Sequence, residues 1–241
     1  MIIEGRNAVS EAAKAGTAFE KVYAEEGAER TGSGRELLSA LRASYRVNIV
    51  PKAVLDRMSP TKHHQGFLAV APDYAYCEPE DLLKIAEARG EPPFLVMLCG
   101  VEDPHNLGSV IRVCECAGAH GVIIPKHSGA PVNETVARVS AGALSHVKVA
   151  RATNLNRTIE DLQKRGVWVY GAEAEGEDLY AADLTGPVCL VVGGEGSGIP
   201  RLTREACDKL VRIPMYGKVN SLNASVAAGV VLYEAVRQRR N

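Results

Sequence analysis

Apolar and polar positions follow two different patterns in the second half of the chain. Runs of consecutive apolar residues predict strands at 94–99, 121–124, 146–149, 167–170, 188–192 and 210–213. Segments with apolar residues every three or four positions predict helices at 107–117, 133–144, 155–165, 201–208 and 224–239. Apolar strands that alternate with helices are typical of a parallel sheet covered on both faces. We therefore predict an α/β fold with a parallel sheet for this part of the chain.

The first 74 residues show the same two patterns on a smaller scale. Helices are predicted at 7–15 and 34–44, and strands at 21–24, 46–50 and 67–71. A polar loop at 61–66 comes directly before the last of these strands. This alternation predicts a small α/β domain at residues 1–74.

An acidic segment separates the two parts. Residues 75–91 carry two basic and five acidic side chains, a net charge of −3, whereas the parts before and after it are each at +1. The segment holds one predicted helix, 79–89, capped by Gly90. We interpret residues 75–92 as a linker and residues 93–241 as the second domain.

The composition narrows the class of protein. Of 241 residues, 46% are hydrophobic and 24% charged, which is ordinary for a globular chain and excludes disorder as its main state. Lys and Arg number 28 against 29 Asp and Glu, so any nucleic-acid binding must come from local patches. Aromatic residues make up only 5%, which argues against RNA modules that stack bases on aromatic platforms.

Nothing in the sequence predicts a membrane span or a metal site. The longest uncharged apolar runs are about half of the ~18 residues that a span needs. The six cysteines form no C-x-x-C pair, and Cys114 and Cys116 would face different ways on a helix. We expect a reduced, cytoplasmic protein without bound metal.

Candidate chemistry lies where the predicted parallel strands end, because ligands bind at that edge of such sheets. The strand at 94–99 runs into a polar turn and a helix, which Asp103 or Asn106 could cap. Arg112 lies farther along that helix among apolar residues. On this segment alone, the simpler interpretation is an arginine that reaches past the core to a carboxylate.

Two further strands end in unusual segments. Residues 191–200 contain four glycines within six positions, more than a turn needs, and match neither a P-loop nor G-x-G-x-x-G. We predict a ligand-binding loop here. After the last strand, Ser221 or Asn223 can cap the terminal helix, but capping does not explain the four polar residues that gather there. These are Asn220, Ser221, Asn223 and Ser225.

The terminal helix carries small residues over much of its surface. They are Ala224, Ser225, Ala227, Ala228 and Gly229. Small side chains allow another element to approach closely, so this helix is either a core helix or part of a subunit contact.

These segments together resemble the SpoU branch of the SPOUT RNA methyltransferases, the TrmH-like ribose 2′-O-methyltransferases. The resemblance rests on E-D-P-H-N-L-G-S-V-I-R (102–112), V-V-G-G-E-G-S-G-I-P (191–200) and I-P-M-Y-G-K-V-N-S-L-N-A-S-V-A (213–227). Two N-terminal segments, E-G-R-N-A-V (4–9) and H-Q-G-F-L-A (64–69), look like a ribosomal-protein-like RNA-binding domain. That domain is found in the subgroup that modifies a guanosine of large-subunit (23S) rRNA.

The resemblance implies a fold that spacing alone could not reveal. The chain near 191–227 is expected to form a deep trefoil knot that binds S-adenosylmethionine in a bent conformation. Matching positions imply that Gly193, Ile213 and Leu222 line the cofactor pocket, with Gly194, Gly196 and Met215 nearby. The resemblance also implies a homodimer with the terminal helix in its interface.

The catalytic positions implied by the resemblance are Asn106, Arg112, Glu195, Ser221 and Asn223. The family mechanism gives Arg112 the role of base, although a guanidinium normally stays protonated at neutral pH. We expect Arg112 to anchor the RNA phosphate or stabilise the developing alkoxide, with deprotonation only if phosphate and desolvation assist. The other four would hold the ribose or Arg112 by hydrogen bonds.

Three alternatives remain at this point. The RNA could be tRNA rather than 23S rRNA. The chain could be a non-catalytic RNA-binding assembly factor, although such a factor need not keep Arg112, Glu195 and Asn223. It could also be another nucleotide-binding α/β enzyme, against which the missing phosphate-loop lysine counts.

Overall fold

The computed structural model describes residues 1–196, 198–219 and 221–240. The chain divides into two compact units. The first joins Met1–Ala75 with Val132–His146, and the second joins Tyr76–Pro131 with the chain from Val147 onward. Each unit is built around its own sheet.

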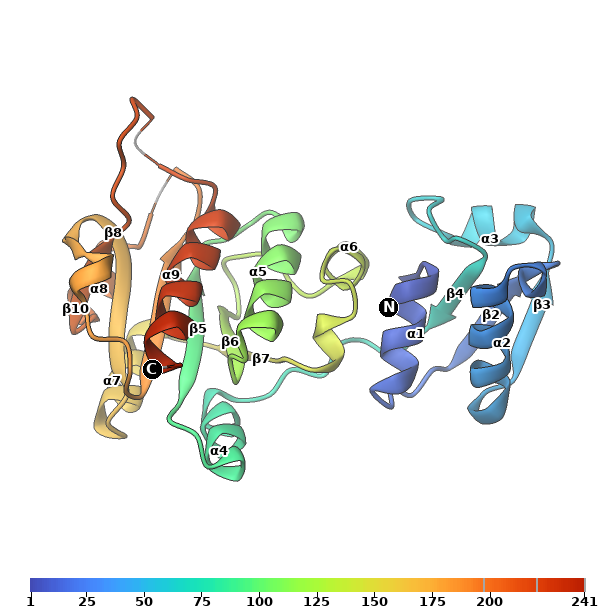
Figure 1. The fold of residues 1–241 in the computed structure, drawn as a ribbon, viewed down its shortest axis with the longest axis horizontal. Coiled ribbons are helices and arrows are strands. Elements are labelled where there is room, and N and C mark those ends of the chain that lie inside the picture. The colour runs from blue at the N-terminus through green and yellow to red at the C-terminus, as the bar shows by residue number, and fades with distance from the viewer. Residues whose placement is uncertain (197, 220, 241) are drawn as a thin grey trace. The chain divides into compact units, whose positions relative to one another are not determined.

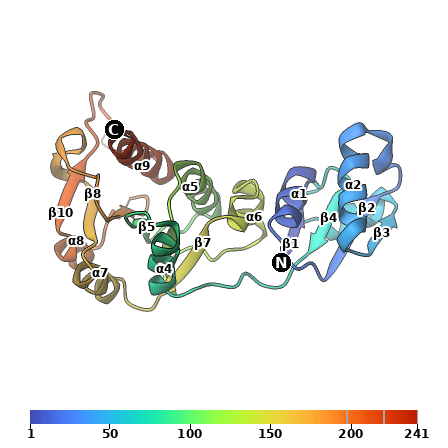
Figure 2. The ribbon, with the colours of Figure 1, turned by 60° about the horizontal axis from the view of Figure 1, so that its bottom comes forward.

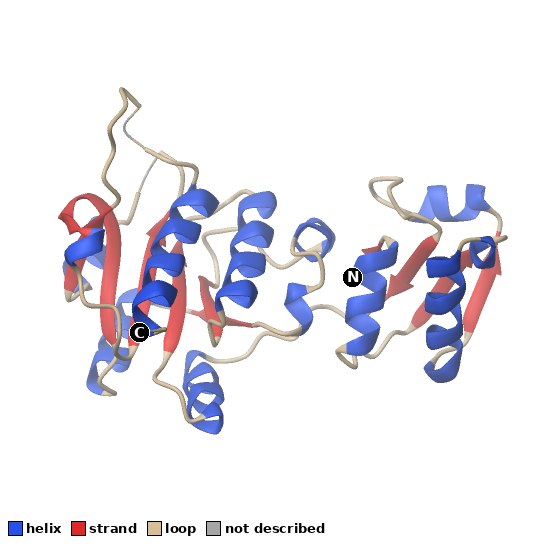
Figure 3. Cartoon of the chain, in the orientation of Figure 1, coloured by secondary structure: helices blue, strands red, loops and turns tan. Residues whose placement is uncertain are grey.

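Six parallel strands form the sheet of the second unit (Figures 1 and 3). They are β5 (Phe94–Cys99), β6 (Gly121–Pro125), β7 (Lys148–Ala152), β8 (Trp168–Asp178), β9 (Val188–Gly193) and β10 (Lys209–Arg212). Their order across the sheet is β10-β8-β9-β5-β6-β7. The prediction of an α/β fold with a parallel sheet is confirmed.

Helices cover both faces of this sheet (Figure 2). On one face α5 (Pro104–Ala117) packs beside α9 (Ala224–Arg239). The other face is covered by α4 (Pro79–Arg89), α7 (Leu155–Lys164) and α8 (Arg201–Ala206). Leu82 of α4 and Ile159 of α7 are fully buried in the core beneath them. Burial on both faces explains why these strands are apolar at nearly every position.

The strand order places a topological switch point in the sheet. From β5 the chain proceeds outward through β6 and β7, then crosses back to add β8, β9 and β10 on the other side. The direction of winding therefore reverses between β5 and β9. In open parallel sheets, ligands bind outside the carboxyl ends of the strands at such a switch point.

Helix α9 is held at its far end by Arg239. The guanidinium donates to the carbonyl oxygens of Leu184 at 3.2 Å and Pro93 at 3.1 Å. It also lies over the ring of Phe94, 4.5 Å from the ring centroid. These contacts tie the end of α9 to the starts of β5 and β9, so the beginning of the helix is held over the carboxyl edge.

The first unit has a four-stranded mixed sheet in the order β1-β4-β2-β3. Its strands are β1 (Ile2–Glu4), β2 (Lys21–Glu25), β3 (Val47–Val50) and β4 (Phe67–Val70). Its helices are α1 (Arg6–Lys14), α2 (Gly32–Ser44) and α3 (Lys52–Met58). The sequence did not predict β1 or α3, because three and seven residues are too few to establish a periodicity.

Two segments differ from the sequence-based prediction. The helix predicted at 133–144 ends early: α6 covers Glu134–Val139, a 3₁₀ turn covers Ala143–Ser145, and Ala141 and Gly142 between them have φ of +52° and +97°. This break lets the backbone of Gly142 lie against Glu11, where a Cβ atom would come within 2.5 Å of the Glu11 Cβ.

The segment predicted as a linker, 75–92, is the second difference. Most of it is α4, which starts with a capping box between Glu78 and Asp81 and ends at a left-handed Gly90. Its buried Leu82 makes it part of the second unit. The helix predicted at 79–89 is confirmed, whereas the acidic charge that marked the segment as a linker did not show that this helix packs on the second sheet.

Within the described ranges, no helix combines the length and apolarity needed to cross a membrane. The same residues contain no group of three or more His, Cys, Asp or Glu side chains arranged to hold a metal ion. Cys114 is buried and Cys116 exposed, as their spacing on one helix predicts.

Candidate functional site

Three segments meet at the carboxyl edge between β5 and β9. They are the start of α5, the glycine-rich turn after β9 and the start of α9. Each contributes one polar side chain to a single hydrogen-bonded network, formed by Asn106, Glu195 and Asn223. These residues are 28 to 117 positions apart in the sequence.

Capping at the start of α5 leaves Asn106 available to the network. The Asp103 side chain accepts a hydrogen bond from the His105 N–H at 2.9 Å, and Pro104 occupies the first turn. Asn106 therefore does not cap the helix. Its side chain is only 7% exposed, and a buried amide requires polar partners.

Capping at the start of α9 fixes the orientation of Asn223. Its Oδ1 accepts from the Ser225 N–H at 3.0 Å, the Ser225 hydroxyl at 2.6 Å and the Val226 N–H at 3.4 Å. Because the oxygen serves the cap, the Nδ2 group must point the other way. That group donates to Asn106 Oδ1 at 2.9 Å and to Glu195 Oε1 at 2.5 Å.

Glu195 is the acceptor on which the network converges. Its Oε1 also accepts from Asn106 Nδ2 at 2.9 Å. The residue is exposed, and its Oε2 has no hydrogen-bond partner within the described part of the chain. The network thus orients a carboxylate whose second oxygen can accept a hydrogen bond from a hydroxyl or a guanidinium.

The glycines after β9 allow the turn to pack against neighbouring backbone. A Cβ on Gly193 would lie 2.2 Å from the carbonyl carbon of Gly198, and one on Gly194 would lie 2.1 Å from the Gly100 oxygen. Gly196 has φ +80° with open space around it. Close packing against neighbouring backbone therefore requires glycine at positions 193 and 194. At position 196 the left-handed backbone conformation favours glycine. Ser197 of the same motif lies outside the described residues.

Glu173 on β8 is a neighbour of this turn that the sequence did not indicate. Its Oε1 accepts from the Ile199 N–H at 2.7 Å and would lie 3.1 Å from a Cβ on Gly198. The sequence-based strand ended at Tyr170, whereas β8 continues to Asp178. The available signal was the position of Glu173, an acidic residue three positions after the predicted strand end at Tyr170. This signal was missed because the predicted strand ended too early.

Two predicted catalytic residues lie outside the network. Arg112 and Ser221 are both exposed, and neither side chain makes a hydrogen bond or ion pair to another described residue. Arg112 is six positions after Asn106, so it lies about 120° around α5 and about 9 Å along it. The carboxylate partner expected for Arg112 from its segment alone is not found among these residues.

The apolar residues predicted to bind a cofactor follow β10. Ile213 is half-buried, whereas Met215 and Leu222 are 41% and 37% exposed. Their segment extends past the carboxyl edge of the strands (Figure 1). Exposed apolar side chains beside a glycine-rich turn are suited to an apolar ligand face. Asn220, which the sequence grouped with Ser221, lies outside the described residues.

Two cysteines of this unit are not candidates for a nucleophile, the buried Cys99 and the half-buried Cys207 that follows α8. Burial raises the pKa of the Cys99 thiol, at the end of β5, to about 12, and that of the Cys207 thiol to about 12. Both thiols are therefore protonated at neutral pH, and only the thiolate attacks efficiently.

Two family models match the chain. Residues 93–233 match the SpoU rRNA Methylase family. Residues 2–77 match a model described as RNA 2′-O ribose methyltransferase substrate binding.

Relatives match over most of their length. The putative TrmH family tRNA/rRNA methyltransferase YacO of Bacillus subtilis (strain 168) is 44% identical over 236 residues, which cover 98% of this chain and 94% of YacO. The 23S rRNA (guanosine-2′-O-)-methyltransferase RlmB of Ralstonia nicotianae is 48% identical over 204 residues, 84% of this chain and 81% of RlmB.

A solved structure has a similar fold. The SpoU methyltransferase AviRb from Streptomyces viridochromogenes, in complex with the cofactor AdoMet, superposes with a TM-score of 0.84 at 26% identity. The match covers all of this chain and 91% of that one.

Proposed function

Because the chain belongs to the SpoU rRNA methylase family, we propose that it transfers a methyl group from S-adenosylmethionine to the ribose 2′-hydroxyl of a guanosine in 23S rRNA. The observation that carries this proposal is the Asn106–Glu195–Asn223 network at the switch point of the sheet. The choice of guanosine in 23S rRNA is supported by the named activity of the RlmB relative.

The residues at the carboxyl edge fit S-adenosylmethionine. Gly196 exposes backbone with open space around it, and the buried Gly193 and Gly194 hold the turn close to neighbouring backbone. Ile213, Met215 and Leu222 offer partly exposed apolar surface that suits an adenine ring. When bound, the cofactor supplies the activated methyl group on its sulfonium.

The chain itself must orient the ribose and manage the proton of its 2′-hydroxyl. Glu195, held by two amides through Oε1, keeps Oε2 for a hydrogen bond from a ribose hydroxyl or from Arg112. Arg112, exposed and unpaired within the described residues, anchors the RNA phosphate and stabilises the developing alkoxide. Ser221 hydrogen-bonds the ribose. The 2′-hydroxyl proton passes to Arg112 only if phosphate and desolvation assist, and such a transfer to a positioned base contributes about 10²–10⁴-fold.

The proposal gives the N-terminal domain, residues 1–74, the task of binding the RNA. The substrate-binding family model over residues 2–77 supports this role. A 23S rRNA substrate is consistent with the cytoplasmic location expected from the sequence. The trefoil knot near 191–227 remains a prediction from the family.

The proposal includes a homodimer formed through α9. Val226 and Tyr233 on this helix are 51% and 50% exposed, and apolar side chains at that exposure are suited to a subunit contact. Light scattering on the purified protein tests this part. A monomeric mass at micromolar concentration would contradict it.

Methylation of defined RNAs by the purified protein tests the main proposal. Transcripts of 23S rRNA and a tRNA pool are incubated with labelled S-adenosylmethionine, and 2′-O-methylated positions are mapped. A methylated guanosine in 23S rRNA is the expected result. Methylation of tRNA alone would show that the substrate is tRNA rather than 23S rRNA. The description of YacO as a tRNA/rRNA methyltransferase is compatible with either substrate. Binding without methyl transfer to either RNA would instead indicate an assembly factor.

A further inference from the structure

A loop in the first unit joins α3 to β4 and contains residues 59–66. Strand β4 is antiparallel to β1 and β2, with Leu68 opposite Glu4 and Phe67 opposite Ala24. The loop therefore lies at the same sheet edge as the ends of β1 and β2. The Glu25 N–H donates to the Gly66 oxygen at 2.8 Å, which fixes the last residue of the loop to that edge.

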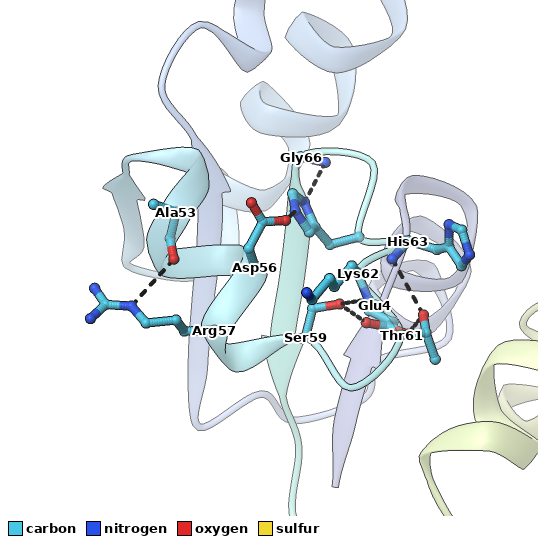
Figure 4. A network of polar contacts seen from close by, with 10 residues as sticks. Glu4, Ala53, Asp56, Arg57, Ser59, Thr61, Lys62, His63 and Gly66 are labelled. Atoms are coloured by element: carbon cyan, nitrogen blue, oxygen red, sulfur yellow. Dashed lines mark hydrogen bonds and ion pairs between the residues drawn. The ribbon is translucent and has the colours of Figure 1, made fainter.

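A buried carboxylate holds the beginning of the loop (Figure 4). Glu4 is 4% exposed and accepts hydrogen bonds from the hydroxyls of Ser59 and Thr61. The same hydroxyl oxygens accept from the backbone, Ser59 Oγ from the Lys62 N–H at 2.8 Å and Thr61 Oγ1 from the His63 N–H at 3.3 Å. One glutamate thus determines the backbone path up to His63.

An imidazole holds the end of the loop. His64 is 2% exposed, its Nδ1 accepts from the Gly66 N–H at 3.0 Å, and its Nε2 lies 3.1 Å from Asp56 Oδ1. Since Nδ1 accepts, Nε2 carries the proton that goes to Asp56.

These anchors hold two non-glycine residues in left-handed backbone. Lys62 has φ +62° and Gln65 has φ +49°, two of the three such residues that the structure describes. An ordinary turn places Gly or Asn at such positions. Strained backbone that the surroundings enforce is concentrated at functional sites. Here it accompanies three exposed polar side chains, those of Lys62, His63 and Gln65.

From this arrangement we infer that the rigid 59–66 loop binds the sugar-phosphate backbone of the substrate RNA through Lys62 and His63. The inference rests on the proposed function and adds the surface by which the first unit binds RNA. The ammonium of Lys62 is exposed and has no ion-pair partner within the described part of the chain. Glu4 is buried with hydroxyls and Asp56 bonds to His64, whereas the Glu25 carboxylate lies beside Gly66, at the end of the loop away from Lys62. A phosphate is the partner that matches an unpaired cation on a fixed backbone.

The test measures binding of a full-length 23S rRNA transcript by the intact protein across a series of salt concentrations. The Lys62→Gln/His63→Gln variant is expected to bind roughly tenfold more weakly at physiological salt, with a salt slope smaller by about one. Lys62→Arg keeps the charge and should restore most of the affinity. Lys21→Gln is the matched control: Lys21 is exposed at the start of β2, on the opposite edge of the same sheet.

The outcomes separate this inference from the proposed function. If the unaltered protein methylates 23S rRNA and the double variant binds the transcript with unchanged affinity and salt slope, the loop is not the RNA contact and only this inference fails. An equal loss in Lys21→Gln would also overturn it, because the effect would then be general charge. If the unaltered protein methylates no RNA, the proposed function fails, whereas loop-dependent binding would still support the RNA contact.

Discussion

Two glutamates organise the polar networks of this chain, Glu4 in the first unit and Glu195 in the second. Both carboxylates accept hydrogen bonds from neighbouring side chains. Glu4 is buried, receives two hydroxyls and lies 3.8 Å from the Nε of Arg138, so both of its oxygens are in use. Glu195 is exposed, and both of its bonds are to one oxygen.

The difference indicates what each network does. A buried carboxylate is stable only when its partners satisfy it, and Glu4 therefore determines the path of the loop around it. The Glu195 carboxylate is oriented through one oxygen at the carboxyl edge of the sheet. Its other oxygen can still accept a hydrogen bond from a hydroxyl or a guanidinium. The first network supports the structure of a surface, and we propose that the second orients a carboxylate for a substrate.

The largest expected effect concerns a residue that neither network contains. Arg112→Ala should lower methyl transfer by about 10²-fold or more, because it removes the group proposed to stabilise the developing alkoxide. Binding of S-adenosylmethionine, measured by calorimetry, should change little. Full activity in this variant would remove Arg112 from the mechanism.

Glu195→Gln tests whether the second network is chemical. The amide replaces a charged acceptor at an exposed position, so kcat should fall by about 10²-fold. The thermal unfolding midpoint should shift little, since exposed substitutions usually change stability by less than ~0.5 kcal/mol. A large loss of stability with retained kcat would assign Glu195 the same structural role as Glu4.

Glu4→Ala should behave in the opposite way. Removing the buried carboxylate leaves two hydroxyls without their acceptor and removes the ion pair with Arg138, at a cost of about 2–4 kcal/mol in unfolding free energy. Denaturant unfolding measures this loss. Methyl transfer at saturating RNA should stay within a few-fold of the unaltered protein, and a selective loss of kcat would contradict the comparison.

Glu173→Ala tests a smaller effect at the glycine turn. Without the acceptor for the Ile199 N–H, the turn is less fixed, and the Kd for S-adenosylmethionine should rise roughly fivefold, about 1 kcal/mol. Glu173→Gln, which keeps an acceptor oxygen, should restore most of the affinity. Glu175→Ala is the control, because that side chain is 82% exposed and forms, among the described residues, a single ion pair, with Arg204 at 3.7 Å. Equal losses in both alanine variants would contradict a positioning role for Glu173.

The smallest effect is a pH dependence in the second unit. Burial lowers the pKa of His120 below its usual value, and the hydrogen bond to Glu91 offsets only part of this effect. The Nδ1 atom of His120 accepts a hydrogen bond from the Phe94 N–H at 3.0 Å. Because the folded state binds this proton less readily than the unfolded state, unfolding free energy should fall as pH drops below about 6.5, by at most ~1.4 kcal/mol per pH unit. Above that pH the contribution is complete. Denaturant unfolding between pH 5 and 8 measures it, and His120→Gln should flatten the dependence.

Local signals in the sequence predicted much of the fold. The predicted bounds 79–89 and 224–239 coincide with those of α4 and α9. Gly90 supplies a left-handed end to the first, and Asn223 supplies a side-chain cap to the second. Where a break depended on a contact elsewhere in the chain, as at Gly142 against Glu11, the prediction of one continuous helix at 133–144 was wrong.

The sequence by itself determined the parallel α/β class, the cap residues and the polar residues available at the strand ends, because these depend on spacing within a few turns of chain. Tertiary structure decided which of them meet. It joined Asn106, Glu195 and Asn223, left Arg112 and Ser221 apart from them, and added Glu173 through the length of β8. The physical reason is that strand order and register set the distances between side chains on different strands, and backbone hydrogen bonds between strands are the same for every sequence. The spacing of residues along the chain therefore does not encode the distances between those side chains.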